Sequence, residues 1–361
     1  MQNITLPREV VSVLSDWYRT VSRDLPWRRD PSPYGVWISE IMLQQTRIEA
    51  VIPYYNRFMA ELPRVEALAA CDDDRLMKLW QGLGYYSRAR NLKKAAVTIV
   101  KDHGGNLPAD YDALRKLSGI GDYTAGAIGS IAFGLPTPAV DGNVMRVVTR
   151  IAAWGEDIAK PQTKRDITQA LGELYPSGDR ASLFTQGLME LGEAVCIPNG
   201  VPKCAECPLS HLCLAYGQGN PTDYPVKSPK KPRRVEEKWV FLLSCKGKYA
   251  IRKRPENGLL AALWEFPNRP KEGTPEDFLA NWGLQPETIE KGPDGVHIFT
   301  HVEWRMTGIR AELSEPHPDF TWATPDEILG IYAVPTAFKV FLKELEKEKE
   351  KLNFPIITKT T

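Results

Sequence analysis

The sequence predicts a multidomain protein in which a mainly α-helical domain is followed by a smaller α+β domain. Three observations carry this prediction. Apolar side chains recur at three- and four-residue spacing from Leu6 to about Tyr216, a pattern typical of amphipathic helices. Residues 219–234 are rich in proline, lysine and arginine and have no periodic apolar face, which predicts a linker. Beyond them apolar and polar side chains alternate, as in half-buried strands.

Two motifs mark helix boundaries within the helical region. Thr46-Arg47-Ile48-Glu49 has the spacing of a capping box and predicts the start of a helix. His103-Gly104-Gly105 predicts the end of a later one, because glycine favours the left-handed conformation that terminates helices.

The C-terminal region gives three further signals. Lys246-Gly247-Lys248 separates two apolar runs and predicts a β-hairpin. Residues 297–313 alternate again and predict another strand segment. Residues 336–352 combine apolar side chains at helical spacing with a charged tail, which predicts an amphipathic closing helix.

Composition excludes several classes of protein. The chain has 361 residues, of which 43% are hydrophobic and 25% charged, the profile of an ordinary globular protein. No apolar run approaches the ~18 residues of a membrane helix, and the N-terminal residues lack a secretory signal pattern. Disordered, collagen-like and membrane-spanning classes are therefore excluded. The short N-terminus, without a transit extension, predicts a bacterial cytoplasmic protein.

The net charge of the chain does not favour nucleic-acid binding. Forty-six Lys and Arg side chains against 45 Asp and Glu give a formal net charge of +1. Compact nucleic-acid binders often have a pI above ~9. Charge alone therefore favours an enzyme acting on a small molecule over one acting on DNA.

Four of the six cysteines crowd together near the end of the helical region. They are Cys196, Cys204, Cys207 and Cys213. In a chain without a secretory signal, such a group indicates a metal site rather than a disulfide framework. Four thiolates can hold Zn²⁺ or a 4Fe–4S cluster. The single Cys-x2-Cys pair and the uneven spacing favour the cluster, with zinc as the alternative.

A Gly-Ile-Gly turn, residues 119–121, lies between two helical patterns. Such a turn, placed at the start of a helix, can direct free backbone N–H groups at a phosphate. An ordinary tight turn is the alternative, since Gly-x-Gly alone is common. A phosphate site of this kind uses amides rather than lysines and is compatible with a net charge of +1.

Two carboxyl groups are candidates for a catalytic pair. Glu40 lies in an otherwise apolar segment, and Asp141 precedes an apolar run. The alternatives are an exposed position on an amphipathic helix for Glu40 and a helix N-cap for Asp141. Cleavage of a glycosidic bond needs an acid and an anion that stabilises an oxocarbenium-like transition state. An apolar wall keeps a carboxyl protonated, whereas a helix N-terminus keeps one ionised.

The Gly-Ile-Gly hairpin, Asp141 and the four cysteines follow one another along the chain. This order of motifs resembles that of the endonuclease III superfamily of helix-hairpin-helix DNA glycosylases. Within it the chain resembles the MutY family of adenine DNA glycosylases over nearly its whole length. The segments that carry the resemblance are Leu25–Asp30, Ser39–Arg47, Gly82–Leu92 and Ala139–Val147, with Gly258–Pro267 and Ile298–His301 in a Nudix-like C-terminal domain. It implies a base-excision repair enzyme that flips out adenine mispaired with 8-oxoguanine or guanine and hydrolyses its N-glycosidic bond.

The resemblance also implies a domain plan. The helical catalytic domain spans residues 1–217, with a six-helix barrel containing the hairpin at 26–134 and an iron–sulfur part at 1–25 and 135–217. A Pro-rich basic linker follows at 218–236, then a Nudix-like 8-oxoguanine recognition domain at 237–347 and a tail at 348–361. The cofactor that the resemblance implies is a 4Fe–4S cluster on the four cysteines. The expected partner is double-stranded DNA with A:8-oxoguanine or A:G mispairs. The protein is expected to act as a monomer and not to bind a membrane.

Residue roles follow from the same resemblance. Glu40 matches the general acid that protonates adenine at N7, and Asp141 matches the group that stabilises the oxocarbenium or transiently bonds the sugar. Tyr123 and Asn143 match supporting catalytic positions. The remaining matches are wedging residues Gln45 and Tyr85, 8-oxoguanine contacts Thr46 and Leu83, hairpin residues Gly119 and Gly121, lesion-strand residues Thr300 and His301, and adenine-pocket residues Arg23, Trp27 and Gln186.

Departures from the family pattern refine these expectations. Lyase-competent relatives carry a Schiff-base lysine two residues after the second hairpin glycine, where this chain has Tyr123, so a monofunctional glycosylase is expected. Residues 268–284 lack the Arg-Glu-x-x-Glu-Glu core of Nudix hydrolases, which predicts a binding domain without hydrolysis. Seven residues rather than six separate Cys196 from Cys204, and Thr300 replaces the usual serine.

Two other functions compete with the adenine glycosylase. One is an endonuclease III-like glycosylase/lyase acting on oxidised pyrimidines, against which Tyr123 and the C-terminal domain argue. The other is a catalytically silent, iron–sulfur-stabilised DNA-binding module. The presence of both Glu40 and Asp141 argues against a silent module.

Overall fold

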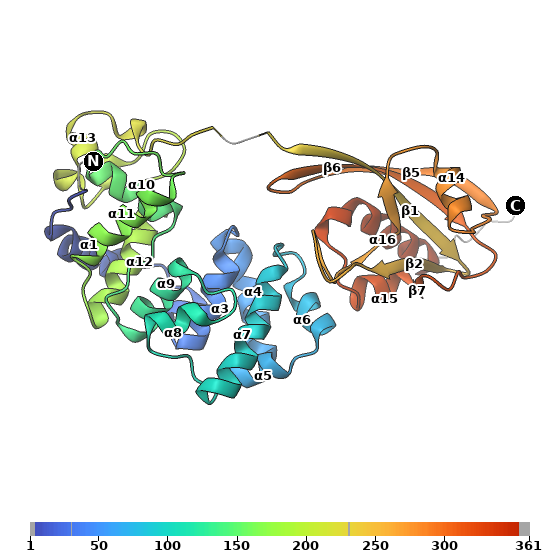
Figure 1. Cartoon of the computed structure of the whole chain (residues 1–361), viewed down its shortest axis with the longest axis horizontal. Coiled ribbons are helices and arrows are strands. Elements are labelled where there is room, and N and C mark those ends of the chain that lie inside the picture. Colours follow the sequence, from blue (N-terminus) through green and yellow to red (C-terminus); the bar gives the residue numbers. More distant parts are fainter. Residues whose placement is uncertain (1–3, 30, 230–231, 354–361) are drawn as a thin grey trace, which may run out of the picture. The chain divides into compact units, whose positions relative to one another are not determined.

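The computed structural model describes residues 4–29, 31–229 and 232–353. The chain divides into two compact units, Met1–Cys71 with Asn91–Lys230, and Asp72–Arg90 with Lys231–Thr361. The first unit is helical, and the second contains a mixed β-sheet (Figure 1). The predicted combination of a helical domain and a smaller α+β domain is confirmed. None of the helices in the described part of the chain is long and apolar enough to cross a membrane.

The region before the sheet consists of helices joined by short connections. Their bounds are α1 Glu9–Val21, α2 Pro26–Arg29, α3 Pro33–Leu43, α4 Ile48–Glu61, α5 Val65–Ala70, α6 Asp73–Trp80, α7 Ser87–His103, α8 Tyr111–Lys116, α9 Asp122–Phe133, α10 Gly142–Ile151, α11 Pro161–Gly172, α12 Asp179–Ala194 and α13 Leu214–Gly217, with short 3-10 turns at Cys204–Glu206, Ser210–Leu212 and Pro221–Asp223.

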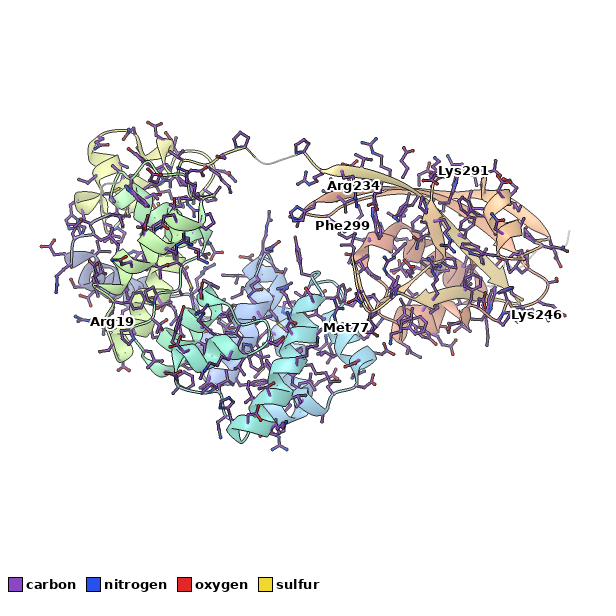
Figure 2. All side chains as sticks on the ribbon, viewed as in Figure 1. Arg19, Met77, Arg234, Lys246, Lys291 and Phe299 are labelled. Atoms are coloured by element: carbon purple, nitrogen blue, oxygen red, sulfur yellow. The ribbon has the colours of Figure 1, made fainter. Side chains whose placement is uncertain are left out.

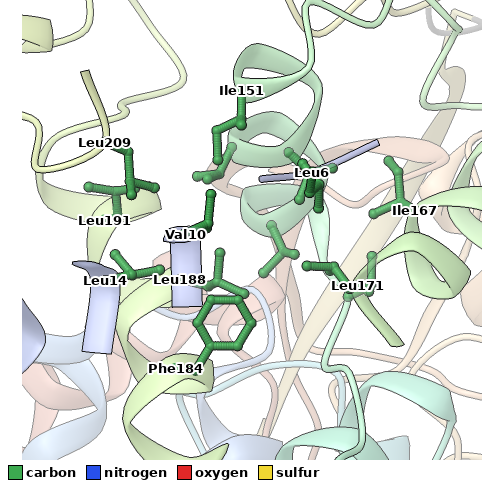
Figure 3. Close-up of a cluster of buried hydrophobic side chains, with 14 of the residues drawn as sticks. Leu6, Val10, Leu14, Ile151, Ile167, Leu171, Phe184, Leu188, Leu191 and Leu209 are labelled. Atoms are coloured by element: carbon green, nitrogen blue, oxygen red, sulfur yellow. The ribbon is translucent and has the colours of Figure 1, made fainter. Parts of the chain in front are cut away.

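The apolar faces of α1, α10, α11 and α12 pack into one core. Figure 3 shows this cluster, in which the side chains of Leu14, Phe184 and Ile167 are fully buried. Removing such side chains from water contributes roughly 1.5–3 kcal/mol each to folding. This core fixes α12 beside α10, and both helices contribute residues to the site described below.

Helices α3 and α9 form the other packing pair that matters for the site. Nine of the eleven α3 residues are buried, so this helix has no solvent face. In α9, Gly126 meets the backbone of Pro138 so closely that a Cβ would lie 2.1 Å from the Pro138 carbonyl oxygen. Glycine therefore lets the segment before α10 cross α9 in contact with it.

Of the helix boundaries that the sequence predicted, the end at His103 and the N-cap at Asp141 are confirmed, and the capping box at Thr46 is not. Helix α7 ends at His103 as predicted, and Gly104 has φ +60°. The predicted N-cap role of Asp141 is confirmed, because its Oδ1 accepts from the Val144 N–H at 2.8 Å. The capping box at Thr46 is wrong: α4 begins at Ile48 with Arg47 at its N-cap and no side-chain cap bond.

Seven described strands form one mixed sheet of order β3-β2-β1-β6-β5, with β4 paired to β1 and β7 paired to β2. Strands β1 and β6 are parallel, and the other pairs are antiparallel. The bounds are β1 Arg234–Cys245, β2 Lys248–Lys253, β3 Trp264–Glu265, β4 Asn268–Pro270, β5 Thr288–Ile298, β6 Val302–Glu312, β7 Thr321–Ala323, with α14 Pro275–Asn281, α15 Pro325–Gly330, the turn Thr336–Phe338 and α16 Lys339–Asn353.

Each face of the sheet has its own core. Helices α15 and α16 cover one face through Ile328 and Phe341 (Figure 1), and Phe338 from the 3-10 turn before α16 packs with them. Helix α14 covers the other face through Leu279, which packs with Phe241. A sheet covered on both faces explains the near-continuous apolar run in β1.

One turn of the sheet matches its sequence prediction, and another interrupts a segment that was predicted as strand. Lys246 and Gly247, both with positive φ, join β1 to β2, and Figure 2 shows Lys246 at this turn. Positive φ at both positions is the geometry of a type I′ hairpin. Residues 297–313 form the end of β5, a turn and β6, with Phe299 at the turn (Figure 2). The closing helix is also confirmed.

Candidate active site

Glu40 is a buried acid on an apolar helix. It lies in the last turns of α3 and its residue surface is 6% exposed. The alternative of an exposed position on an amphipathic helix is therefore wrong. Burial raises the pKa of Glu40 to about 7, because desolvation disfavours the charged carboxylate. At neutral pH a substantial fraction of this group carries a proton.

Tyr123 connects α9 to this carboxyl. Its hydroxyl donates to Oε2 of Glu40 at 2.8 Å. That hydrogen bond stabilises the ionised form of Glu40 and partly opposes the effect of burial on its pKa. Burial also raises the pKa of Tyr123 well above its ordinary value, so the phenol remains a donor.

Asp141 is the N-cap of α10 and faces the same site. Its Oδ2 accepts from the Asn143 side-chain amide at 3.2 Å, and Asn143 Oδ1 accepts in turn from Arg146 at 3.0 Å. Burial raises the pKa of Asp141, although the N–H groups of Val144 and Asn143 act in the opposite direction. The effect of desolvation on this pKa is larger than that of the helix N-terminus.

These groups meet at a cavity of about 260 Å³. It is lined by Leu25, Trp27, Arg28, Val36, Ser39, Glu40, Leu43, Thr46, Arg47, Ile48, Tyr123, Ile131, Asp141, Asn143, Gln186, Met189, Glu190 and Glu193. All four predicted catalytic residues are among them. A carboxyl that can act as an acid and a second carboxyl in the same cavity are the components that glycosidic hydrolysis requires.

The expected adenine-pocket residues divide into two groups. Trp27 and Gln186 line the cavity, and the Trp27 ring packs edge-on against Tyr55 at 5.3 Å. Arg23 is not in the lining. It reaches the cavity wall indirectly, through its Nε 2.6 Å from Glu190 Oε1 and its ion pair with Glu193.

The charged residues of the cavity wall that sequence reasoning missed include Arg28 and Glu190. They form an ion pair, with Arg28 NH2 2.8 Å from Glu190 Oε2. The signal was available, because Glu190 stands in a largely apolar run, as Glu40 does. A carboxylate in such a run indicates either a surface position or a buried partner.

The DNA-binding candidates of the first unit lie beside the catalytic groups. A second cavity of about 670 Å³ is lined by Gln45, Thr46, Gly119 and Gly121 together with Glu40 and Asp141. Gln45 has φ +61°, which costs energy for a residue with a side chain and is often found at functional positions. At the hairpin, Gly119 has φ +76° and Gly121 is the N-cap of α9, as the sequence predicted.

Within the second unit, two other candidates are in contact. The hydroxyls of Tyr85 and Thr300 lie 2.8 Å apart. Tyr85 is 48% exposed and has φ +46°, while His301 is exposed at the turn between β5 and β6. Leu83 is buried, with 6% of its surface exposed.

The four clustered cysteines line one cavity. No disulfide joins them, and Arg150 donates to Cys196 Sγ at 3.2 Å. In the described residues, no three His, Cys, Asp or Glu side chains are already arranged as metal ligands. The donor set and its common cavity nevertheless fit a group held by four thiolates.

Two family models match the chain. Residues 38–176 match the HhH-GPD superfamily base excision DNA repair protein model, and residues 239–344 match a NUDIX domain. The boundaries of both matches fall within the predicted helical and α+β regions.

Similar proteins include adenine DNA glycosylases of animals and bacteria. The one from Mus musculus is 33% identical over 94% of this chain and 78% of its own length. Those from Homo sapiens and Buchnera aphidicola of Schizaphis graminum are 34% and 35% identical, over 90% and 84% of this chain and 72% and 87% of their own lengths. A solved thermostable thymine-DNA glycosylase is 30% identical, with a TM-score of 0.51 over 58% of this chain and 97% of its own.

Proposed function

Because this chain belongs to the adenine DNA glycosylases within the HhH-GPD superfamily, we propose that it excises adenine mispaired with 8-oxoguanine or guanine. The chain is a DNA glycosylase, a hydrolase of N-glycosyl bonds in base-excision repair. The observation that carries the mechanism is the buried Glu40 carboxyl, whose pKa of about 7 leaves a proton available at neutral pH.

Glu40 is the general acid in this proposal. Its Oε2 is engaged by Tyr123, which leaves Oε1 as the oxygen that delivers a proton to N7 of adenine. Protonation converts the base into a neutral leaving group and lowers the barrier to cleavage of the N-glycosidic bond. An acid with a pKa near the working pH is well matched to this transfer.

Asp141 stabilises the positive charge that develops on the sugar. Its two oxygens are oriented by the Val144 N–H and the Asn143 amide, so the carboxylate needs little reorganisation during the reaction. Water then completes hydrolysis at the anomeric carbon and leaves an abasic site.

Base flipping is part of the proposal because the acid is buried. Glu40 is 6% exposed, so a base stacked in a duplex cannot reach its carboxyl. Gln45 and Tyr85 are proposed to wedge into the duplex, where they would help to offset the few kcal/mol (order of magnitude) lost on unstacking. Their positive φ values support a functional constraint at both positions.

Recognition of 8-oxoguanine is assigned to the Nudix-like region. Its β5–β6 turn carries exposed Thr300 and His301, and Tyr85 contacts Thr300 within the same compact unit. Residues 268–284 lack the acidic core of the hydrolases, which supports binding without hydrolysis. Double-stranded DNA with the A:8-oxoguanine mispair is therefore the proposed substrate.

A monofunctional reaction follows from the chemistry at position 123. A phenol cannot form the imine that a lyase needs. Lys164 is the lysine among the lining residues of the larger cavity. Borohydride should trap little covalent complex with DNA. Efficient trapping that disappears in Lys164→Ala would contradict the monofunctional assignment.

Cys196, Cys204, Cys207 and Cys213 are proposed to hold a 4Fe–4S cluster as a structural element. Four thiolates on a short loop satisfy the coordination of such a cluster. The loop packs on α10, because Arg146 donates to the Cys196 carbonyl and Arg150 to the Ile197 carbonyl. Holding this loop would help to keep α10, and with it Asp141, in place.

A single-turnover assay tests the proposed function. Duplexes with adenine opposite 8-oxoguanine, guanine or cytosine are incubated with excess protein, and released adenine is measured. We expect rapid release opposite 8-oxoguanine, slower release opposite guanine and little opposite cytosine.

Two variants identify the acid. Glu40→Gln should retain mispair binding and lose base release, whereas Glu49→Gln, which alters an exposed acid on α4, should behave as the unaltered protein. Substantial adenine release by Glu40→Gln would overturn the assignment of Glu40.

A further inference from the structure

Glu190 is a buried carboxylate in the cavity wall to which the mechanism above gives no role. It lies on α12 with 3% of its surface exposed. Its two oxygens contact two arginines, Arg23 Nε at 2.6 Å and Arg28 NH2 at 2.8 Å. A buried carboxylate is costly unless it is paired, so this arrangement is specific rather than incidental.

The arginines differ in their relation to the cavity. Arg28 lines it, with its guanidinium 5.3 Å from the centre of the Tyr18 ring. The Tyr18 hydroxyl in turn donates to Gln186 at 2.9 Å. Arg23 is outside the lining and also pairs with Glu193. Glu190 therefore holds a cation in the wall of the cavity that contains Glu40.

An uncompensated cation in this wall would act against the general acid. A positive charge near a carboxyl favours its ionised form, and low-dielectric surroundings strengthen the effect. Burial, Tyr123 and Asp141 have larger effects on the pKa of Glu40, and Arg28, even when paired with Glu190, still lowers it. A carboxylate 2.8 Å from Arg28 supplies the opposite charge at almost the same place.

We propose that Glu190 is a positioning residue that fixes the Arg28 guanidinium in the cavity wall and offsets its charge, so that Arg28 does not drive the general acid Glu40 into its ionised form. This inference rests on the proposed function, because it concerns the acid of that reaction. Through Glu190, helix α12 would help to set the pH range in which the enzyme is active.

Charged and titratable groups that line the cavity with Glu40 all contribute to its electrostatic surroundings. They come from every described element packed around the cavity: Arg28 from α2, Arg47 after α3, Tyr123 from α9, Asp141 before α10, and Glu190 and Glu193 from α12. Glu190 is distinguished from Glu193 by its burial, since the Glu193 side chain is 44% exposed and more strongly screened by water.

The test is the pH profile of single-turnover adenine release from an A:8-oxoguanine duplex, measured on the full chain. Glu190→Gln removes the charge and keeps the shape. We expect the alkaline midpoint to fall by about one pH unit, so that release slows about tenfold at alkaline pH and is restored at acid pH. Asp179→Asn, which removes a charge from an exposed position on the same helix, should leave the midpoint in place.

A double variant separates a charge effect from loss of structure. Arg28→Gln with Glu190→Gln removes both charges, and the midpoint should return to that of the unaltered protein even if the maximal rate is lower. An unchanged or raised midpoint in Glu190→Gln, or no return in the double variant, would overturn the inference. If the unaltered protein releases no adenine at any pH, the proposed function fails instead.

Discussion

Replacing Glu40 by glutamine should stabilise the protein while abolishing its chemistry. Burial raises the pKa of Glu40 from 4.5 to about 7 in the folded chain. A group whose pKa is higher in the folded chain adds to the free energy of unfolding, relative to its ionised form, most fully below its unfolded pKa. For Glu40 this stabilisation is lost as the pH rises from 4.5 to about 7. Each pKa unit corresponds to about 1.4 kcal/mol, so ionised Glu40 costs about 3 kcal/mol at pH ~8 and less than ~1 kcal/mol at pH ~5.

Glutamine fills the same space and still offers an oxygen to the Tyr123 hydroxyl. Chemical denaturation at the two pH values measures the difference in free energy of unfolding, with Glu49→Gln as the exposed control. A stability gain that is equal at both pH values, or a loss at alkaline pH, would refute the argument that Glu40 is held in a site hostile to its charge.

Three further predictions test neighbouring parts of the account. Tyr123→Phe removes the hydrogen bond that stabilises ionised Glu40, so the alkaline midpoint of adenine release should rise by up to about one pH unit; a lower midpoint would contradict this. Gly126→Ala places a Cβ 2.1 Å from the Pro138 carbonyl and should lower the free energy of unfolding by about 1–3 kcal/mol or more, measured by urea denaturation. Cys207→Ser should reduce the iron content of the purified protein, and a full complement of iron would remove Cys207 from the ligand set.

The sequence predicted local features well because they depend on nearby residues. Asp141 as a helix N-cap, the end of α7 at His103 and the turn at Lys246 all follow from residue preferences within one turn of chain. The capping box at Thr46 failed for a related reason. Arg47 takes the N-cap position, so Thr46 lies one residue too early to bond the helix N-terminus.

The contact between Tyr123 and Glu40 could not be predicted from residue patterns alone. It depends on how closely α3 and α9 pack and on where the segment before Asp141 crosses α9, which Gly126 makes possible. The raised pKa of Asp141 could not be predicted from the sequence for the same reason. Its burial is a tertiary property, and it outweighs the helix N-terminus that the sequence reveals.

The net charge of +1 was a misleading guide to function. It favoured a small-molecule enzyme, whereas the chain is a DNA glycosylase. A whole-chain sum hides local arrangements such as the uncapped N-terminus of α9 at Gly121. Buried pairs also cancel in the sum, as Glu190 and Arg28 do, although their placement matters to the site.

The most direct test of the central claim is the rate of adenine release from an A:8-oxoguanine duplex as a function of pH. If a protonated Glu40 drives the reaction, release is fast below a midpoint near pH 7 and falls about tenfold per pH unit above it. A rate that stays constant from acid to alkaline pH while adenine is still released would contradict the account.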